Sequence, residues 1–434
     1  TKTIAPFELF HCILGESPAL VLGQIFGLQK DSFPIVPSRA AVKCLPWCPM
    51  TFDIVRATQA HRLVEGHPWS SIFNTDIPSA SHGPLVSVAI APFAWLFPTA
   101  MTGLRFLIPL VGAVSIVGLA TFVRRVSASD RAALIAAVLA AVYPGLWVRD
   151  GLVVSEPFAI AAFVWLLALQ PGWGSDRRWR HTVLMGVLVA VIALARAELL
   201  ALAVLVVIVS WWWHRATVSK VRGLTVVLVA AVLCSPWVLY NQGRFAKPVY
   251  LSTNLGITLA GANCHLAYYD GRFIGYDDMG CWSAAAKAHP SLDESVRSSG
   301  MTRDAWAYAT AHAHRWPIVV AAREAWFFGL YRPNWVVYMS KGAGQRVWAS
   351  WAQAVGGYIL FPTFLWALWQ RRKKAASSER LARRLIILTA LFSVALAGAF
   401  VGHWRYRLGL DVVALVAVAL WLDGRRVEAA HPTA

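Results

Sequence analysis

This chain has few charged residues for its length. Only 14% of its 434 residues are Asp, Glu, Lys or Arg, whereas 58% are hydrophobic. A soluble domain usually carries about 25% charged residues. The apolar residues gather in blocks of roughly 15–24, the length that crosses a bilayer. The composition therefore excludes an ordinary soluble globular protein and predicts an all-α membrane protein with several spanning helices.

Acidic residues are scarcer than basic ones. The chain has 22 Asp and Glu against 40 Lys and Arg, which gives a formal net charge of +18. Such a charge could indicate nucleic-acid binding, but the basic residues stand in short clusters at the ends of apolar segments rather than along one polar face. Clusters at segment ends are typical of the cytoplasmic side of membrane proteins. We therefore predict contact with a bilayer and no nucleic-acid partner.

Cysteine is also scarce, with six residues in all, and this count excludes a dense disulfide framework. Cys264 and Cys281 lie in the one long polar segment, where a bridge is allowed if that segment is exported. Cys44 and Cys48 are a second possible pair. Neither pair has histidines at a spacing typical of zinc sites, so we predict no metal site here.

Motifs for several enzyme classes do not occur. The sequence has no Walker loop, no dinucleotide-binding glycine pattern, no zincin motif and no serine nucleophile elbow in a credible context. An ATP-driven pump and a redox or nucleotide cofactor are therefore not expected.

The basic clusters predict how the chain crosses the membrane. Each cluster follows an apolar segment and is assigned to the inner side, while isolated carboxylates fall between the clusters on the outer side. The clusters are Arg124-Arg125, Arg177-Arg178-Trp179-Arg180, His214-Arg215 with Lys220 and Arg222, Arg371-Arg372-Lys373-Lys374, and Arg425-Arg426. Spans are expected near residues 104–123, 130–148, 156–171, 181–213, 223–240, 347–370, 384–402 and 408–423.

The run at residues 181–213 is too long for one span, and Arg196 and Glu198 interrupt it near the middle. As a single helix it would be about 50 Å long, well beyond a bilayer core of about 30 Å. Basic residues flank both of its ends, so an even number of crossings is required. We predict two short spans joined by an outer turn at Arg196-Ala197-Glu198, and about nine to ten spanning helices in total.

The chain is expected to have three parts. Residues 1–50 form an atypical or truncated N-terminal segment, because the apolar stretch there is too short to span and no signal-peptide pattern is present. Residues 51–423 form the transmembrane domain, with a first outer loop and interfacial helix at 51–103 and a large outer loop at 241–346. Residues 424–434 form a cytoplasmic tail.

The outer side collects the residues that could carry chemistry. Carboxylates and guanidinium groups near membrane depth are costly to bury, so they pair with each other or serve a site. One base and one cationic clamp would suit a reaction with a phosphate leaving group. The residues assigned to this face are Asp53, His82, Asp150, Glu156, Arg196, Glu198, Arg405, Tyr406 and Arg407.

A purely structural role would also explain each of these residues. Asp53 and Glu156 each open a predicted helix, where a carboxylate caps the N-terminus or favours the helix dipole. Local ion pairs would account for Arg196 with Glu198 and for Asp150 with Arg149. A turn would account for His82, and an interfacial cap would account for Arg405, Tyr406 and Arg407.

The order of several short motifs resembles the integral-membrane GT-C glycosyltransferases. The nearest branch contains the protein O-mannosyltransferases and the lipid A aminoarabinose transferase, and is similar to glycosyltransferase family 39. The likeness covers about residues 50–423. The motifs are Asp53 followed by Ala60-His61-Arg62-Leu63-Val64-Glu65-Gly66, His82-Gly83-Pro84-Leu85, Tyr143-Pro144, Ser155-Glu156-Pro157, Arg196-Ala197-Glu198, Ser235-Pro236-Trp237 with Tyr240-Asn241, Ser252-Thr253-Asn254 with Gly256, Gly261-Ala262-Asn263, and Arg405-Tyr406-Arg407.

This resemblance implies a multi-pass enzyme of a bacterial plasma membrane with its active site outside. It would move a hexosyl or pentosyl group from a polyprenyl-phosphate donor to an envelope glycan, lipid or protein, with inversion. Asp53 and Glu156 match the acidic catalytic positions of the first and second outer loops. A divalent ion, Mg²⁺ or Mn²⁺, is an optional cofactor. The implied donor-phosphate residues are His82, Arg196, Arg405 and Arg407, and the implied acceptor or supporting residues are Glu198, Tyr406 and Asn254.

The chain departs from the family pattern at a few positions, which concern catalysis more than fold. Two further hypotheses remain. A transporter or flippase for a lipid-linked glycan would often show an inverted repeat, and none is visible in this sequence. A non-catalytic or truncated homologue is the second. The departures are Val55-Arg56 in place of an aromatic pair, His82-Gly83-Pro84 for His-Pro-Pro, Arg196-Ala197-Glu198 for Arg-Pro-Glu, and Gly409 for Pro.

Overall fold

The computed structural model describes residues 52–71, 74, 76–96, 106–176, 178–342, 344–371 and 377–430, without the side chains of 52–54, 377 and 425–430. Within these ranges the regular structure is helical, and one isolated antiparallel bridge joins Ser70 to Pro78. The predicted all-α class is therefore confirmed. The predicted segment 1–50, with Cys44 and Cys48, lies outside the described residues.

Most of the predicted spans coincide with helices, but the span expected at 130–148 is broken after Val142, and α20 begins before the predicted residue 384. The α-helices are α3 (Phe52–Val64), α4 (Leu85–Leu96), α6 (Leu107–Ser127), α7 (Asp130–Val142), α8 (Pro144–Trp147), α9 (Glu156–Leu169), α10 (Trp179–Ala195), α11 (Leu200–Trp213), α12 (Lys220–Gln242), α13 (Leu255–Ala262), α14 (His265–Tyr269), α15 (Met279–Ala288), α16 (Glu294–Ala311), α17 (Trp316–Phe327), α18 (Pro333–Gly342), α19 (Val347–Gln370), α20 (Ser377–Ala399) and α21 (Leu408–Ala430). Short 3-10 helices are η2 (Gln170–Gly172), η3 (Ala197–Leu199), η4 (Ala313–Arg315) and η5 (Trp404–Arg407).

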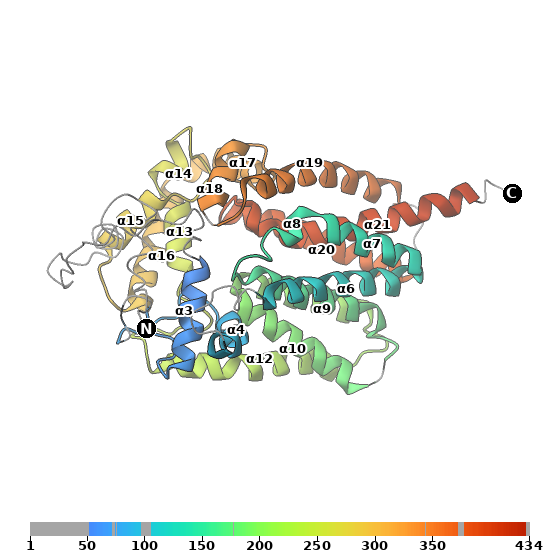
Figure 1. The fold of residues 1–434 in the computed structure, drawn as a ribbon, viewed down its shortest axis with the longest axis horizontal. Coiled ribbons are helices and arrows are strands. Elements are labelled where there is room, and N and C mark those ends of the chain that lie inside the picture. Colours follow the sequence, from blue (N-terminus) through green and yellow to red (C-terminus); the bar gives the residue numbers. More distant parts are fainter. Residues whose placement is uncertain are drawn as a thin grey trace.

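The helices of the bundle run along the longest axis of the molecule, and helices α13–α18 gather at one end of it together with α3 (Figure 1). We call residues 255–342 the cap. At the opposite end α6 and α19 finish and α10 and α12 begin. We call this the basic end, because these termini carry Arg124, Arg125, Arg215, Arg222 and Arg371.

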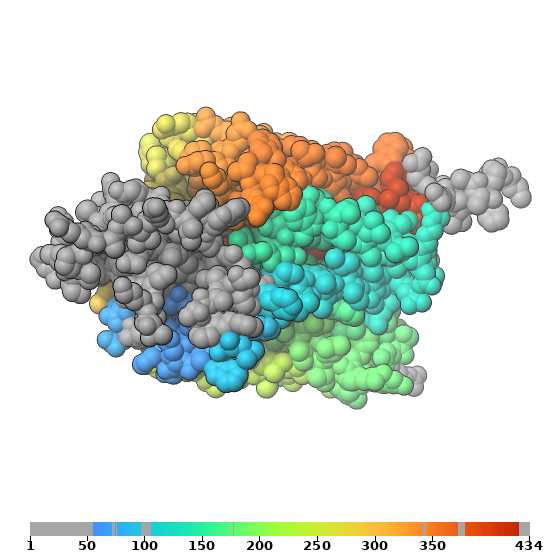
Figure 2. All heavy atoms as spheres, viewed as in Figure 1, coloured from blue at the N-terminus to red at the C-terminus, as the bar shows by residue number. Residues whose placement is uncertain are grey.

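Helices α9 and α21 form the centre of the bundle. Nearly every side chain of α9 is buried, and all nine residues from Val412 to Leu420 in α21 are buried. A helix that is apolar and buried all round belongs in a core. Helix α21 packs against α7, α19 and α20, while α9 packs against α6 and α10. Figure 2 shows α6 and α7 (blue-green) filling one face between the orange α19 side and the green side of α10 and α12.

The outer surface of the bundle is apolar, as expected for contact with lipid. Helix α12 exposes Val221, Leu224, Val227, Leu228 and Val232. Within the described ranges, three helices are long and apolar enough to span a membrane, at Leu107–Ser127, Lys220–Gln242 and Ser378–Ala399. Four shorter apolar helices accompany them, at Leu85–Leu96, Glu156–Gly172, Trp179–Ala195 and Ala197–Trp213. The protein is thus a membrane protein, while nine to ten spans stays a prediction.

The long apolar run breaks where its two charged residues lie. Helix α10 ends at Ala195, and Arg196 adopts an extended conformation (φ −148°, ψ 100°) before η3 and α11 begin. Arg196 therefore sits between two helices whose other ends lie at the basic end. An arginine and a glutamate at this break can reach a polar site instead of facing lipid.

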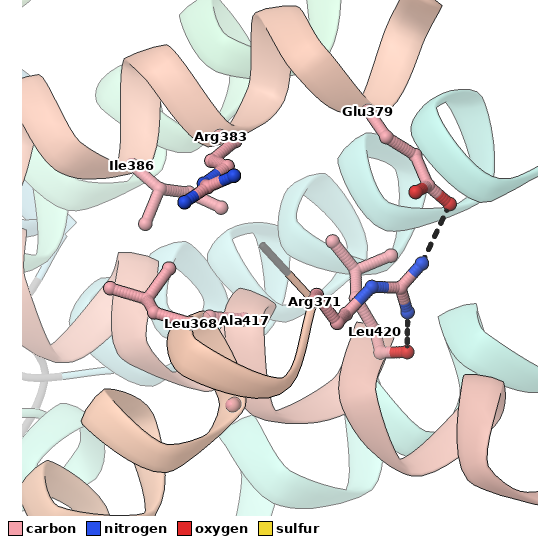
Figure 3. A pocket seen from close by; sticks show the side chains of 8 residues that line it. Leu368, Arg371, Glu379, Arg383, Ile386, Ala417 and Leu420 are labelled. Atoms are coloured by element: carbon pink, nitrogen blue, oxygen red, sulfur yellow. Dashed lines mark hydrogen bonds and ion pairs between the residues drawn. The ribbon is translucent and has the colours of Figure 1, made fainter. Parts of the chain in front are cut away.

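At the basic end, arginines tie helix termini together. Arg371, at the end of α19, donates to Glu379 Oε1 (2.8 Å) and to the backbone carbonyl of Leu420, closing one side of a small pocket between α19, α20 and α21 (Figure 3). Arg383 extends toward the same pocket beside Ile386 (Figure 3). Arg371 thus links the end of α19 to the start of α20 and to the interior of α21.

A disulfide and a buried arginine hold the cap. Cys264, before α14, is bonded to Cys281 of α15. The Arg323 side chain of α17 is 4% exposed and donates to the carbonyls of Gly398 (3.0 Å) and Ala262 (2.7 Å). It therefore joins the end of α20 in the bundle to the end of α13 in the cap.

Replacing both Cys264 and Cys281 with Ser is expected to lower the free energy of unfolding of the cap by about 3 kcal/mol, because the bridge closes a loop of this length. Limited proteolysis and thermal unfolding in detergent would measure the change, with Cys234→Ser, a free cysteine outside the cap, as the control. Equal stability of the double variant and the wild type would contradict the expectation.

Candidate active site

Glu156 is the centre of a charged cluster at the cap end of the bundle. Its side chain is 1% exposed, and it is the first residue of α9. Glu156 Oε1 lies 2.9 Å from Arg196 Nη1 and 2.7 Å from Arg405 Nη2, and it also accepts from Arg405 Nε at 3.0 Å. One carboxylate oxygen thus holds two guanidinium groups by charge-assisted contacts.

Local sequence places each of these residues at an element boundary. Pro157 follows Glu156 in the first turn of α9, where its missing N–H costs nothing. Arg196 occupies the break between α10 and α11. Arg405 lies in η5, and its backbone N–H donates to His403 Nδ1 (3.0 Å). Three helix boundaries that are far apart in the sequence therefore bring their charged side chains together at the Glu156 carboxylate.

Arg196 also pairs with Glu198 and stacks on Tyr406. Its Nε and Nη2 lie 2.7 Å and 2.5 Å from Glu198 Oε1, and its guanidinium carbon is 5.2 Å from the centroid of the Tyr406 ring. Glu198 keeps one third of its side chain exposed. The local Arg196–Glu198 pair therefore forms, and it forms inside the Glu156 cluster.

Arg149 is the least satisfied group in this region. It is 3% exposed, and neither terminal nitrogen has a hydrogen-bond partner in the described part of the chain. It interacts electrostatically with Glu156 and Arg405, and burial lowers its pKa to about 10. Buried guanidinium nitrogens that lack hydrogen bonds, as these do among the described residues, are costly, so this position would gain from a bound anion. From the sequence, Arg149 was expected only as a local ion-pair partner of Asp150. Its position directly after a predicted span was the feature that could have indicated a functional role.

Arg56 and two histidines complete the cluster. Arg56 is 4% exposed and donates to Ser155 Oγ (3.3 Å), which joins α3 to the start of α9. Burial and the nearby charges of Arg56 and Arg405 hold the pKa of His82 well below its usual value, and burial with Arg405 does the same for the pKa of His403. Both imidazoles are therefore neutral at neutral pH. Sequence reasoning included His82 but missed Arg56 and His403.

Arg407 lies in a different cluster from Arg405. It is 0% exposed, and its Nε lies 3.1 Å from Asp411 Oδ1. The Tyr143 hydroxyl donates to the same Asp411 oxygen at 3.1 Å. The guanidinium carbon of Arg407 lies 4.8 Å from the centroid of the Phe361 ring. The structure thus places this predicted phosphate ligand inside the bundle, bound to a carboxylate of its own.

Among the remaining predicted residues, Asn254 and Asp150 contact other parts of the described chain. Asp53 is at the start of α3, and its side chain lies outside the described ones. Asn254 is exposed and donates to Thr258 Oγ1 at 3.3 Å. Asp150 lies against Gly112 of α6. Across the described residues, no three His, Cys, Asp or Glu side chains are grouped for a metal ion, so we derive no step through the optional divalent ion.

Comparison with solved structures finds an oligosaccharyltransferase and a protein named ArnT. The apo oligosaccharyltransferase of Archaeoglobus fulgidus superposes with a TM-score of 0.50 and 15% identity, covering 89% of this chain and 49% of its own. The apo ArnT of Cupriavidus metallidurans gives a TM-score of 0.40 and 17% identity, covering 86% of this chain and 71% of its own. No protein-family model matches the sequence. No curated protein matches it either.

The superposition with the oligosaccharyltransferase defines the fold class. This chain is a helical membrane protein with the GT-C fold, as the sequence motifs predicted. It spans about half the length of that oligosaccharyltransferase. Membership in the protein O-mannosyltransferase branch stays a prediction.

Proposed function

We propose that this protein is a membrane glycosyltransferase that transfers a sugar from a polyprenyl-phosphate donor to an acceptor outside the cytoplasm. The observation that carries the proposal is the buried guanidinium of Arg149, whose terminal nitrogens have no hydrogen-bond partner among the described residues, beside the Glu156–Arg196–Arg405 group. Guanidinium groups bind phosphate through paired hydrogen bonds. The GT-C fold, shared with an oligosaccharyltransferase, supports a lipid-linked sugar as the molecule that brings this phosphate.

The charges around Glu156 suit the departing phosphate better than the intact donor. The four arginines around Glu156 bring positive charge to this position. A lipid-phosphate sugar is a diester with one negative charge, whereas the released lipid phosphate carries about two. Guanidinium groups therefore stabilise the phosphate charge that develops in the transition state more than the single charge of the bound donor, which is the condition for acceleration. The group consists of Arg56, Arg149, Arg196 and Arg405 with Glu156 and Glu198.

The proposed reaction is a direct displacement with inversion. The acceptor hydroxyl oxygen forms a bond to the anomeric carbon while the bond from that carbon to the phosphate oxygen breaks. The bonding electron pair leaves with the lipid phosphate, and Asp53 takes the hydroxyl proton. Glu156 already has three guanidinium contacts on one oxygen, so we assign it the role of positioning the arginines.

The distribution of basic residues indicates which end of the molecule faces the cytoplasm. The basic end carries the clusters that favour the cytoplasm, so the cap and the Glu156 cluster would face outward. We propose a bacterial plasma membrane location, where an envelope glycan, lipid or protein is the acceptor. Arg196 and Arg405, with Arg149, are the proposed phosphate ligands.

The test uses proteoliposomes with a panel of polyprenyl-phosphate sugars and envelope acceptors. We expect transfer by the wild type and a loss of about 100- to 10,000-fold in Asp53→Asn, because general-base catalysis contributes that much. Asp76→Asn, an exposed residue of the same loop, is the control. Full transfer by Asp53→Asn would refute the role of Asp53. Movement of the lipid-linked sugar across the bilayer without transfer would instead favour the transporter hypothesis.

A further inference from the structure

The cap contributes one carboxylate to the active-site region that the sequence motifs do not include. Asp277 lies between α14 and α15 and is half-buried. The charges of Arg405 and Arg323 lower the pKa of its carboxyl, and the charge of Asp277 in turn raises the pKa of the Tyr406 hydroxyl. The ring of its neighbour Tyr276 lies 6.0 Å from the ring of His403, directly before η5, so this segment of the cap reaches the edge of the cluster.

Contacts on both sides of Asp277 fix its position. Before it, the ring of Tyr276 is 4% exposed and lies 4.7 Å from the Trp326 ring and 6.0 Å from the His403 ring. After it, Asp278 Oδ1 accepts from the backbone N–H of Gly280 at 2.7 Å, capping α15. The backbone N–H of Asp278 donates to the carbonyl of Gly261 at 3.2 Å. The carboxyl of Asp277 is thus presented by a rigid segment.

The turn before Asp277 requires glycine. Gly275 has φ +77°, a conformation that L side chains rarely adopt, and a Cβ there would lie 2.7 Å from the backbone nitrogen of Arg323. This close approach brings the segment onto α17, whose Arg323 also binds the end of α20. The cap is therefore seated on the bundle next to Asp277.

Asp277 differs from the other carboxylates of the cluster in being available to a substrate. Glu156 is paired with Arg196 and Arg405, and Glu198 is paired with Arg196. For Asp277, no side chain in the described part of the chain donates a hydrogen bond. Burial and the charge of Asp278 raise its pKa to about 7, although a hydrogen bond from its own backbone N–H and the charges of Arg405 and Arg323 oppose this shift. A partly accessible carboxylate of this kind accepts hydrogen bonds from hydroxyl groups and repels a phosphate.

We propose that Asp277 is an acceptor-binding residue that accepts a hydrogen bond from a hydroxyl group of the acceptor and holds it on the cap side of the Arg405 cluster. This inference rests on the proposed transferase function. Asp277 changes no bond itself; the displacement and the proton transfer remain as described above. Because the carboxylate repels the donor phosphate, the acceptor is the substrate that its removal affects.

The experiment compares Asp277→Asn and Asp277→Glu with the wild type in proteoliposomes. The readouts are undecaprenyl phosphate binding, donor KM and acceptor KM, with alkyl glycosides as hydroxyl-bearing acceptors. We expect Asp277→Asn to raise acceptor KM by at least about tenfold, because a charged hydrogen bond is lost. Lipid phosphate binding should stay within about twofold. Asp277→Glu should recover part of the loss. Asp304→Asn, an exposed cap residue with a side chain 54% exposed, is the control.

The pH profile separates binding from a purely structural role. Because the pKa of Asp277 is raised to about 7, its carboxylate is lost as the pH falls below that value. The wild-type kcat/KM for the acceptor should then rise with pH through about 7, and Asp277→Asn should flatten this rise at the low value.

Three outcomes would overturn the inference. An unchanged acceptor KM in Asp277→Asn would remove the acceptor role while leaving the proposed function intact. A donor KM raised as much as the acceptor KM would place the hydroxyl on the transferred sugar instead. If the wild type transfers no sugar to any acceptor of the panel, the proposed function fails and the role of Asp277 fails with it.

Discussion

Replacing Arg149 with Met is expected to reduce sugar transfer at least about 100-fold while stabilising the protein by about 1–3 kcal/mol. The two effects have one cause. The guanidinium is 3% exposed and its terminal nitrogens have no hydrogen-bond partner among the described residues, so the resting protein bears an uncompensated desolvation cost. Methionine has a similar length and no charge, so it removes this cost. It also removes a cation that the departing phosphate would need.

Transfer rate, undecaprenyl phosphate binding and thermal unfolding in detergent would be measured on the same preparations. Arg272→Met provides the matched control, because the Arg272 side chain is 69% exposed and pairs with Asp270 in the cap. That variant should leave all three quantities nearly unchanged. Retained transfer in Arg149→Met would remove Arg149 from the phosphate site. A fall in stability of several kcal/mol would mean that the guanidinium has a partner in the folded protein.

Replacing Asp411 alone with Leu is expected to lower the free energy of unfolding by about 3–5 kcal/mol. Asp411 and Arg407 are both 0% exposed and lie 3.1 Å apart. Without the carboxylate, Arg407 becomes a buried charge with no counter-ion, and the Tyr143 hydroxyl loses its acceptor. Removing both charges, in Arg407→Met with Asp411→Leu, should recover most of the loss, because apolar replacements of a buried pair are often neutral or stabilising.

Thermal unfolding of the two single variants and the double variant gives the coupling between the two side chains. An Asp411→Leu protein as stable as the wild type would contradict the expected cost. The double variant also tests the phosphate role that the sequence motifs implied for Arg407. If it is stable yet transfers about 100-fold less sugar, Arg407 contributes to the reaction despite its burial.

Several features of the fold were predictable because they depend on local sequence. The apolar run expected at 347–370 coincides with α19 (Val347–Gln370), and the last span begins at residue 408 in both the prediction and the structure. The break at Arg196 followed from the length of the run and the basic residues at its ends. Hydrophobic length and charge placement decide these features, and both are visible along the chain.

Which carboxylate each arginine of the site binds could not be predicted from the sequence, because these ion pairs depend on the tertiary structure. Arg405 and Arg407 are two residues apart and carry the same charge, yet Arg405 binds Glu156 and Arg407 binds Asp411. Their side chains reach different carboxylates because η5 packs against α17, α20 and α21. Arg149 illustrates the same limit, since the absence of hydrogen-bond partners for its terminal nitrogens among the described residues depends on which side chains other helices bring near it.

The helical membrane class, the positions of the long apolar segments and the difference in charge between the two ends could all be predicted from the sequence, because these properties depend on residues close together in the chain. The sequence could not predict which arginines share Glu156, which buried arginine has terminal nitrogens without hydrogen bonds among the described residues, or that the Asp277 segment of the cap reaches η5. Those relations join residues up to about 250 positions apart. Contacts at such separations form only when whole helices pack against one another.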